Sequence, residues 1–199
     1  MSADTSSART TRAAWPGLRV AALLGAFVAA VGLRVAVGGS DVSQSLPAGL
    51  AFAGSLLILA LASGTRVQVR VSAILSGIAG GIVICLPVAL AQLLAHRPLH
   101  DTTGLWPWAL VVAVLVGAEE VFLRGTLYEA VSDLAGSASA VGVGAIAFAL
   151  MHVPLYGWHV LPLDLAVGVV LGMLRTSTGT VAAPTLAHLI ADYAGWFLR

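Results

Sequence analysis

Charged residues are scarce in this chain, and lysine is missing altogether. The 199 residues include 10 basic residues, all of them arginine, and 9 acidic residues. Charged residues therefore make up 10% of the chain, whereas a soluble globular domain contains about 25%. So few polar side chains cannot cover the surface of a soluble protein of this size. The net charge of +1 provides no basic patch for phosphates. This composition excludes an ordinary cytosolic enzyme, a disordered chain and a nucleic-acid-binding protein.

Cysteine is almost absent too, since Cys85 is the single one and lies in an apolar run. A disulfide framework is therefore excluded. In contrast, hydrophobic residues make up 59% of the chain. A helix that spans a membrane needs about 20 apolar residues. The sequence thus predicts an all-α fold, a polytopic transmembrane helical bundle of about seven spans without a separate soluble domain.

Short polar breaks separate the apolar segments and define the predicted spans. We place the spans at residues 18–37, 46–63, 71–95, 105–130, 138–155, 159–174 and 180–198. Residues 1–14 are rich in Ser, Thr, Ala and Arg, and we expect a disordered tail. Residues 15–104 then form the N-terminal group of transmembrane helices. Small residues in the spans are expected to allow close helix packing; they include Gly77, Gly80, Gly81, Gly142 and Gly144.

The arginines in the short loops indicate the orientation of the chain in the membrane. A cytoplasmic N-terminus places six arginines inside, namely Arg9, Arg12, Arg19, Arg66, Arg70 and Arg175. It places three outside, namely Arg34, Arg97 and Arg199. The sequence therefore predicts an integral membrane protein with a cytoplasmic N-terminus. Arg34 lies near the end of the first span, where its long side chain is expected to reach the membrane surface.

Ionisable residues inside the predicted spans fall almost entirely in the second half of the chain, and such residues indicate a functional site. Glu119, Glu120 and Arg124 lie in the segment 105–130. Glu120 and Arg124 are four residues apart with the acid first, the favoured order for a helical ion pair. Glu119 points about 100° away on a helix and has no local partner. Such a carboxylate can serve as a general base. The alternative is an ion network that only packs helices.

Two histidines supply further polar groups on separate segments. His152 follows Phe148 by four residues, and His188 and Asp192 share a face of the last predicted span. Each feature alone is typical of helix packing, but together the three segments predict one polar site. Asp192 could orient the imidazole of His188, or both could ligate one ion. Asp164 lies near the start of a span and is expected to be an interfacial residue.

Three motifs follow in order: Glu-Glu-x-x-x-Arg at 119–124, Phe-x-x-x-His at 148–152 and His-x-x-x-Asp at 188–192. They resemble the CPBP family of intramembrane proteases, which includes the type 2 CAAX prenyl endopeptidase and bacterial abortive-infection-like proteins. The resemblance covers roughly residues 105–198 and identifies 105–199 as the catalytic transmembrane core. It implies that Glu119 activates water and that Glu120 and Arg124 form a supporting pair. His152 and His188 would position the water or stabilise the oxyanion.

The chain departs from the family pattern at Asp192, where the family usually has asparagine. Asparagine can donate a hydrogen bond to an oxyanion, whereas an ionised aspartate cannot. Asp192 is therefore protonated, or it orients His188, or it belongs to a metal site. His152, His188, Glu119 and Asp192 would be adequate zinc ligands, but the sequence contains no His-Glu-x-x-His helix. The resemblance favours water activated by glutamate, without a cofactor.

The sequence therefore predicts an intramembrane endopeptidase of the bacterial plasma membrane. Its substrate would be a membrane-embedded or lipid-anchored peptide or protein, and nucleic acid is not a partner. Hydrolysis in a bilayer needs a water-filled cavity, which we expect to open to the cytoplasmic side. One alternative is a non-proteolytic family member, such as an immunity or scaffold membrane protein. Another is a proton-coupled carrier, but a carrier predicts internal symmetry, and the sequence shows none.

Overall fold

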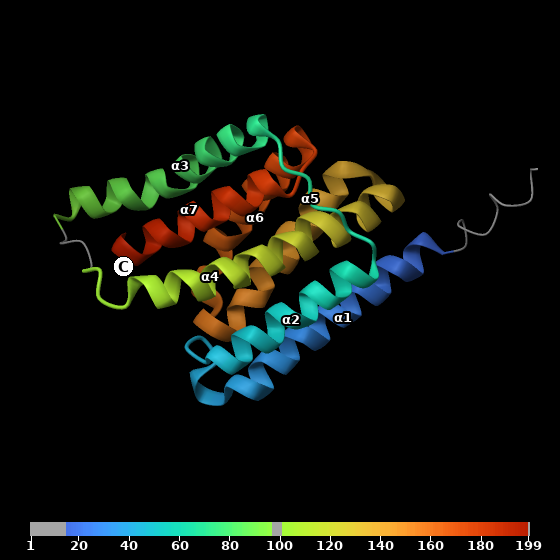
Figure 1. Ribbon diagram of the computed structural model, residues 1–199, viewed down its shortest axis with the longest axis horizontal. Helices are drawn as coiled ribbons and strands as arrows, with labels where there is room; N and C mark the ends of the chain where they lie inside the picture. The colour runs from blue at the N-terminus through green and yellow to red at the C-terminus, as the bar shows by residue number, and fades with distance from the viewer. Residues whose placement is uncertain (1–14, 97–100, 199) are drawn as a thin grey trace, which may run out of the picture.

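The computed structural model describes residues 15–96 and 101–198, and these residues form a helical bundle without a β-strand (Figure 1). This arrangement confirms the predicted all-α fold, while the predicted tail at 1–14 lies outside the described residues. The seven α-helices in the described ranges are α1 (Pro16–Gly38), α2 (Leu46–Ala62), α3 (Val71–Leu94), α4 (Leu105–Glu120), α5 (Tyr128–Tyr156), α6 (Leu161–Thr178) and α7 (Ala182–Leu198).

Apolar side chains cover the outside of this bundle as well as its core. Ile82, Leu86 and Leu93 of α3 are examples of large apolar side chains that are exposed, as expected for a surface that faces lipid. In the described ranges, four helical stretches are long and apolar enough to span a membrane: Pro16–Asp41, Val71–Leu94, Leu105–Tyr156 and Trp158–Thr178. The protein is thus an integral membrane protein. The total of about seven spans stays a prediction.

The longest of these stretches contains two of the predicted spans. A π-helix, η3 (Val121–Leu127), joins α4 to α5, and Gly136 then interrupts α5 with a φ of 82°. Glycine tolerates this backbone conformation because it has no Cβ atom. The chain turns back on itself there (Figure 1). The break that the sequence predicts at 133–137 is therefore confirmed.

Glycines let α3 lie very close to α7, which is its main neighbour. A Cβ atom on Gly77 would lie 2.8 Å from the carbonyl oxygen of Ala183, and one on Gly81 would lie 2.7 Å from the Cβ of Ile190. This close approach confirms the predicted role of small residues in α3. Gly142 was expected to act in the same way, but no atom lies within 4 Å of the Cβ it would carry.

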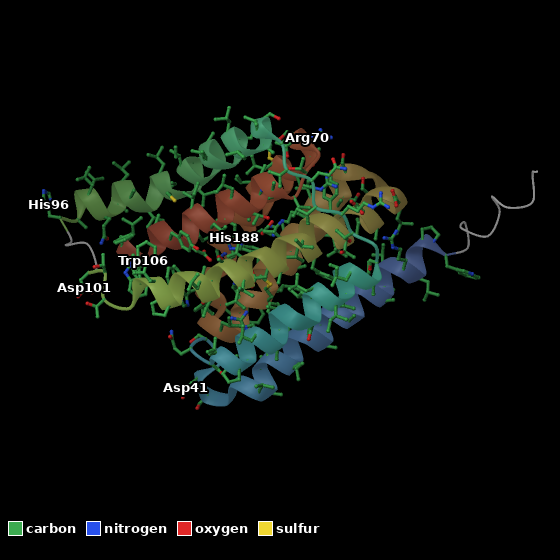
Figure 2. All side chains as sticks on the ribbon, viewed as in Figure 1. Asp41, Arg70, His96, Asp101, Trp106 and His188 are labelled. Atoms are coloured by element: carbon green, nitrogen blue, oxygen red, sulfur yellow. The ribbon has the colours of Figure 1, made fainter. Side chains whose placement is uncertain are left out.

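The two ends of the bundle differ in charge. Arg19 pairs with Asp133 at 3.8 Å, and Arg175 pairs with Glu129 at 3.3 Å, so the start of α1 and the α6–α7 connection lie at one end. Arg70 is at this end too, and Asp41 and Asp101 are at the other (Figure 2). In the described part of the chain, the loops at the Asp41 end contain no arginine.

Gly77→Ala should lower stability by about 1–3 kcal/mol, because the new methyl group would push α3 away from the α7 backbone. Thermal unfolding in detergent micelles measures the effect. Gly142→Ala is the matched control, because the same change in a helix meets no neighbouring atom and should leave stability unchanged or raised. Equal melting temperatures for the two variants would contradict the close packing of α3 on α7.

Candidate active site

The carboxylate of Glu120 lies at the centre of a buried hydrogen-bond network. Its Oε1 atom accepts a hydrogen bond from Arg124 Nη1 at 2.7 Å and lies 2.9 Å from His188 Nδ1. All three side chains are buried. Arg124 also donates to the carbonyl oxygen of Gly168 at 3.2 Å and stacks on the ring of Phe148. The predicted ion pair is confirmed, and both partners of Glu120 contact Oε1, whereas its buried Oε2 has no hydrogen-bond partner among the described residues.

The π-helix η3 begins directly after Glu120, although the sequence had suggested a regular α-helix here. Wide π-turns inside helices are frequent at functional sites. Neighbouring segments hold this turn by two hydrogen bonds. Arg175 Nε donates to the carbonyl oxygen of Arg124 at 2.7 Å, and the hydroxyls of Thr65 and Thr126 are 2.7 Å apart. The α2–α3 connection and α6 thereby fix the π-helix that directly follows both glutamates.

Glu119 has a partner that the sequence did not predict. Its Oε1 atom lies 3.8 Å from Nη1 of Arg34 in α1, and the exposed fractions of the two residues are 4% and 6%. Arg34 stacks on the ring of Phe52 at 5.0 Å. The expectations that Glu119 has no partner and that Arg34 reaches the membrane surface are therefore wrong. Arg34 faces the bundle interior, where a carboxylate and an aromatic face offset the loss of water.

His152 also has an acidic neighbour. Its Nδ1 atom lies 3.3 Å from Oδ2 of Asp164 in α6, and its ring meets Phe148 edge-on at 4.7 Å. Phe148 meets His188 on its other side at 5.2 Å. Asp164 was expected at the interface, but the short connection after Tyr156 folds α6 back along α5. The occurrence of an acidic residue in an apolar segment was the sequence signal that could have indicated that Asp164 belongs to the site.

The remaining contacts join the predicted residues into one cluster. His188 Nε2 lies 3.7 Å from Oδ1 of Asp192, so these two side chains share a helix face as predicted. Glu119 lies within electrostatic range of His152, His188 and Asp192. His188 is in the middle of the bundle, away from both ends (Figure 2). The structure thus gathers the six predicted residues and adds Arg34 and Asp164.

A cavity of about 420 Å³ adjoins this cluster between α3, α5, α6 and α7. Its polar lining includes His152, His188, Asp164 and Asp192. Most of the other lining residues are apolar, among them Ile84, Val88, Leu163 and Val167. Apolar walls with a few polar groups are typical of a site that binds a largely apolar ligand.

The cavity extends from the cluster towards one end of the bundle. Tyr156, Val160 and Leu198 are among its lining residues, and they belong to the bundle end that carries Asp41. The start of α1 lies at the opposite end. The expected opening of the cavity to the cytoplasmic side stays a prediction.

Metal ligation was an open alternative for the cluster. Within residues 15–96 and 101–198, no three His, Cys, Asp or Glu side chains are arranged to hold one metal ion. The Nδ1 atom of His188 faces Glu120, so Nε2 is the nitrogen that faces Asp192. A site without a metal cofactor, which the resemblance favours, stays a prediction.

Comparison with known proteins gives one match. Residues 101–194 match the sequence model of a family described as type II CAAX prenyl endopeptidase Rce1-like. The searches of curated proteins and of solved structures return no match. The matched range contains all six predicted site residues and Asp164, whereas Arg34 lies outside it.

Arg124→Met should cost about 3–5 kcal/mol, because it leaves the buried carboxylate of Glu120 without its cation. Arg19→Met is the matched control. Arg19 and Asp133 also form an ion pair, but their side chains are 45% and 72% exposed, and such pairs contribute about 1 kcal/mol or less. Thermal unfolding in detergent compares the variants, and similar losses in both would contradict the buried network.

Proposed function

Because the chain belongs, through residues 101–194, to the Rce1-like family of type II CAAX prenyl endopeptidases, we propose that it is an intramembrane endopeptidase in which Glu119 activates water. The different partners of the two adjacent glutamates support this assignment. Arg124 and His188 both bind Oε1 of Glu120. The 3.8 Å between Glu119 and Arg34 is too long for a hydrogen bond. We therefore assign the binding of water to Glu119, which is the carboxylate that its neighbours hold less tightly.

In the proposed reaction, Glu119 takes a proton from water, and the oxygen of that water attacks the carbonyl carbon of the peptide. His152 or His188 stabilises the oxyanion of the tetrahedral intermediate by donating a hydrogen bond. The C–N bond then breaks, and the leaving amine takes the proton from Glu119. Glu120 and Arg124 support the reaction by holding Nδ1 of His188, so that its Nε2 is available at the site.

Asp192 has a different role in this proposal from the asparagine that is usual in the family. Its carboxylate lies 3.7 Å from Nε2 of His188 and is partly exposed in the cavity. An ionised aspartate cannot donate to an oxyanion, but it can favour the protonated imidazole that does. We therefore assign Asp192 to the orientation of His188.

The substrate class follows from the cavity and the family. Apolar walls and a polar floor suit a membrane-embedded or lipid-anchored peptide whose scissile bond lies beside His152 and His188. We propose the bacterial plasma membrane as the location, with a cytoplasmic N-terminus. Arg19, Arg66 and Arg70 at the end where α1 begins support this orientation.

Glu119→Gln should abolish peptide cleavage, with a loss of about 100-fold or more, because glutamine cannot accept the proton of water. The purified protein is reconstituted in liposomes and assayed on a panel of membrane-tethered peptides. Glu129→Gln is the matched control, because Glu129 pairs with Arg175 away from the cluster and is not part of the proposed chemistry. Cleavage that survives Glu119→Gln would refute the assignment.

Activity should also withstand metal chelation, since the proposed water activation needs only Glu119. Cleavage is measured before and after prolonged dialysis against EDTA, with metal-free buffer throughout. The expected rates are equal. A loss that zinc restores, together with zinc binding that disappears in His188→Ala, would instead assign a metal site to these residues.

A further inference from the structure

We propose that Arg34 is a positioning residue of the active site and acts as the counter-ion that orients Glu119. The inference rests on the proposed function, but it concerns a residue outside the family range 101–194. Arg34 belongs to α1, and its Nη1 atom lies 3.8 Å from Oε1 of Glu119. The N-terminal helices are therefore part of the catalytic machinery, in addition to any role as a membrane anchor.

Packing holds the guanidinium of Arg34 in place. The group stacks on the ring of Phe52 in α2 at 5.0 Å, and α2 itself contacts α4 and the π-helix η3. Its Nε atom is buried and has no hydrogen-bond partner among the described residues. Burial of a cation with an unsatisfied donor is costly. Arg34 is therefore poorly explained by packing alone, whereas the adjacent carboxylate explains it.

The cluster contains more carboxyl groups than arginines. Glu119, Glu120, Asp164 and Asp192 bring four carboxyl groups together, and Arg124 is the arginine that the family range supplies to them. The two terminal nitrogens of Arg124 bind Glu120 and the carbonyl oxygen of Gly168. Arg124 is thus engaged elsewhere, and Arg34 is the arginine that lies beside Glu119. Coulomb attraction at this distance is strong when water is excluded, so Arg34 can hold the Glu119 carboxylate in one orientation.

The first test compares Arg34→Lys, Arg34→Met and Arg34→Ala in the reconstituted cleavage assay. Arg34→Met should lower kcat about 10- to 100-fold with little change in KM, because misplacement of the base slows the chemical step. Arg34→Lys keeps the charge and should retain more activity. Arg19→Met is the matched control, since Arg19 pairs with Asp133 at the same 3.8 Å but at the surface, and it should keep wild-type kinetics.

Chemical rescue separates a charge effect from a packing effect. Added guanidinium at tens of millimolar should restore part of the activity of Arg34→Ala, whereas urea, which is neutral and of similar shape, should not. Wild-type kcat in Arg34→Met overturns the proposal. Equal rescue by urea and guanidinium also overturns it, because activity would then depend on filling the volume of the missing side chain and not on restoring its charge.

A second measurement needs no substrate and stands apart from the proposed function. Thermal unfolding is compared for wild type, Arg34→Met, Glu119→Gln and the double variant. Loss of Arg34 should lower the melting temperature by at least about 2 °C more when Glu119 is present than when glutamine replaces it. If Arg34→Met lowers the melting temperature equally with glutamate and with glutamine at position 119, the pairing is overturned. It is also overturned if Arg34→Met fails to fold with either residue at that position. If Arg34→Met fails to fold only when Glu119 is present, the result supports the pairing of Arg34 with Glu119.

If the wild type cleaves no peptide, the proposed function fails while the stability comparison still decides whether Arg34 and Glu119 are coupled. If Glu119→Gln abolishes cleavage and Arg34→Met does not, the proposed function stands and this inference alone fails.

Discussion

The need to compensate the charge of one buried carboxylate, that of Glu120, is the constraint on which the rest of the site depends. A carboxylate with no access to water is tolerable only when cations and hydrogen bonds surround it. Arg124 and His188 supply them from two segments that are distant in sequence. This requirement fixes α7 against the α4–η3 junction. It also leaves Glu119, one residue earlier, on a different face, where Arg34 of α1 lies beside it.

The same physical rule explains why the polar cluster draws on both halves of the chain. Glu119 is almost as buried as Glu120 but has no arginine from its own segment. Arg34 reaches it from α1, and Phe52 of α2 stacks on the guanidinium. The glycines of α3 serve a different purpose, because they bring α3 close to α7 and so shape one wall of the cavity. Charge compensation and close packing together position a polar site inside an apolar bundle.

Much of the fold and site could be predicted from local sequence. Apolar runs and the short polar segments between them marked the helices and the break near Gly136, and four-residue spacing marked the Glu120–Arg124 pair. The sequence could not reveal contacts between distant helices. Arg34 near a helix end is equally compatible with the surface and the interior, and only packing of α1 decides between them. Asp164 and the side on which the cavity lies depend likewise on how α6 folds back, and no local pattern encodes the π-helix after Glu120.

The central claim is that two adjacent glutamates have separate tasks, one chemical and one structural. The most direct measurement determines cleavage rate and melting temperature together for Glu119→Gln and Glu120→Gln. The account predicts that Glu119→Gln cleaves nothing and loses less thermal stability than Glu120→Gln, which leaves Arg124 without the anion that it contacts at 2.7 Å. A Glu119→Gln protein that cleaves at the wild-type rate would contradict it.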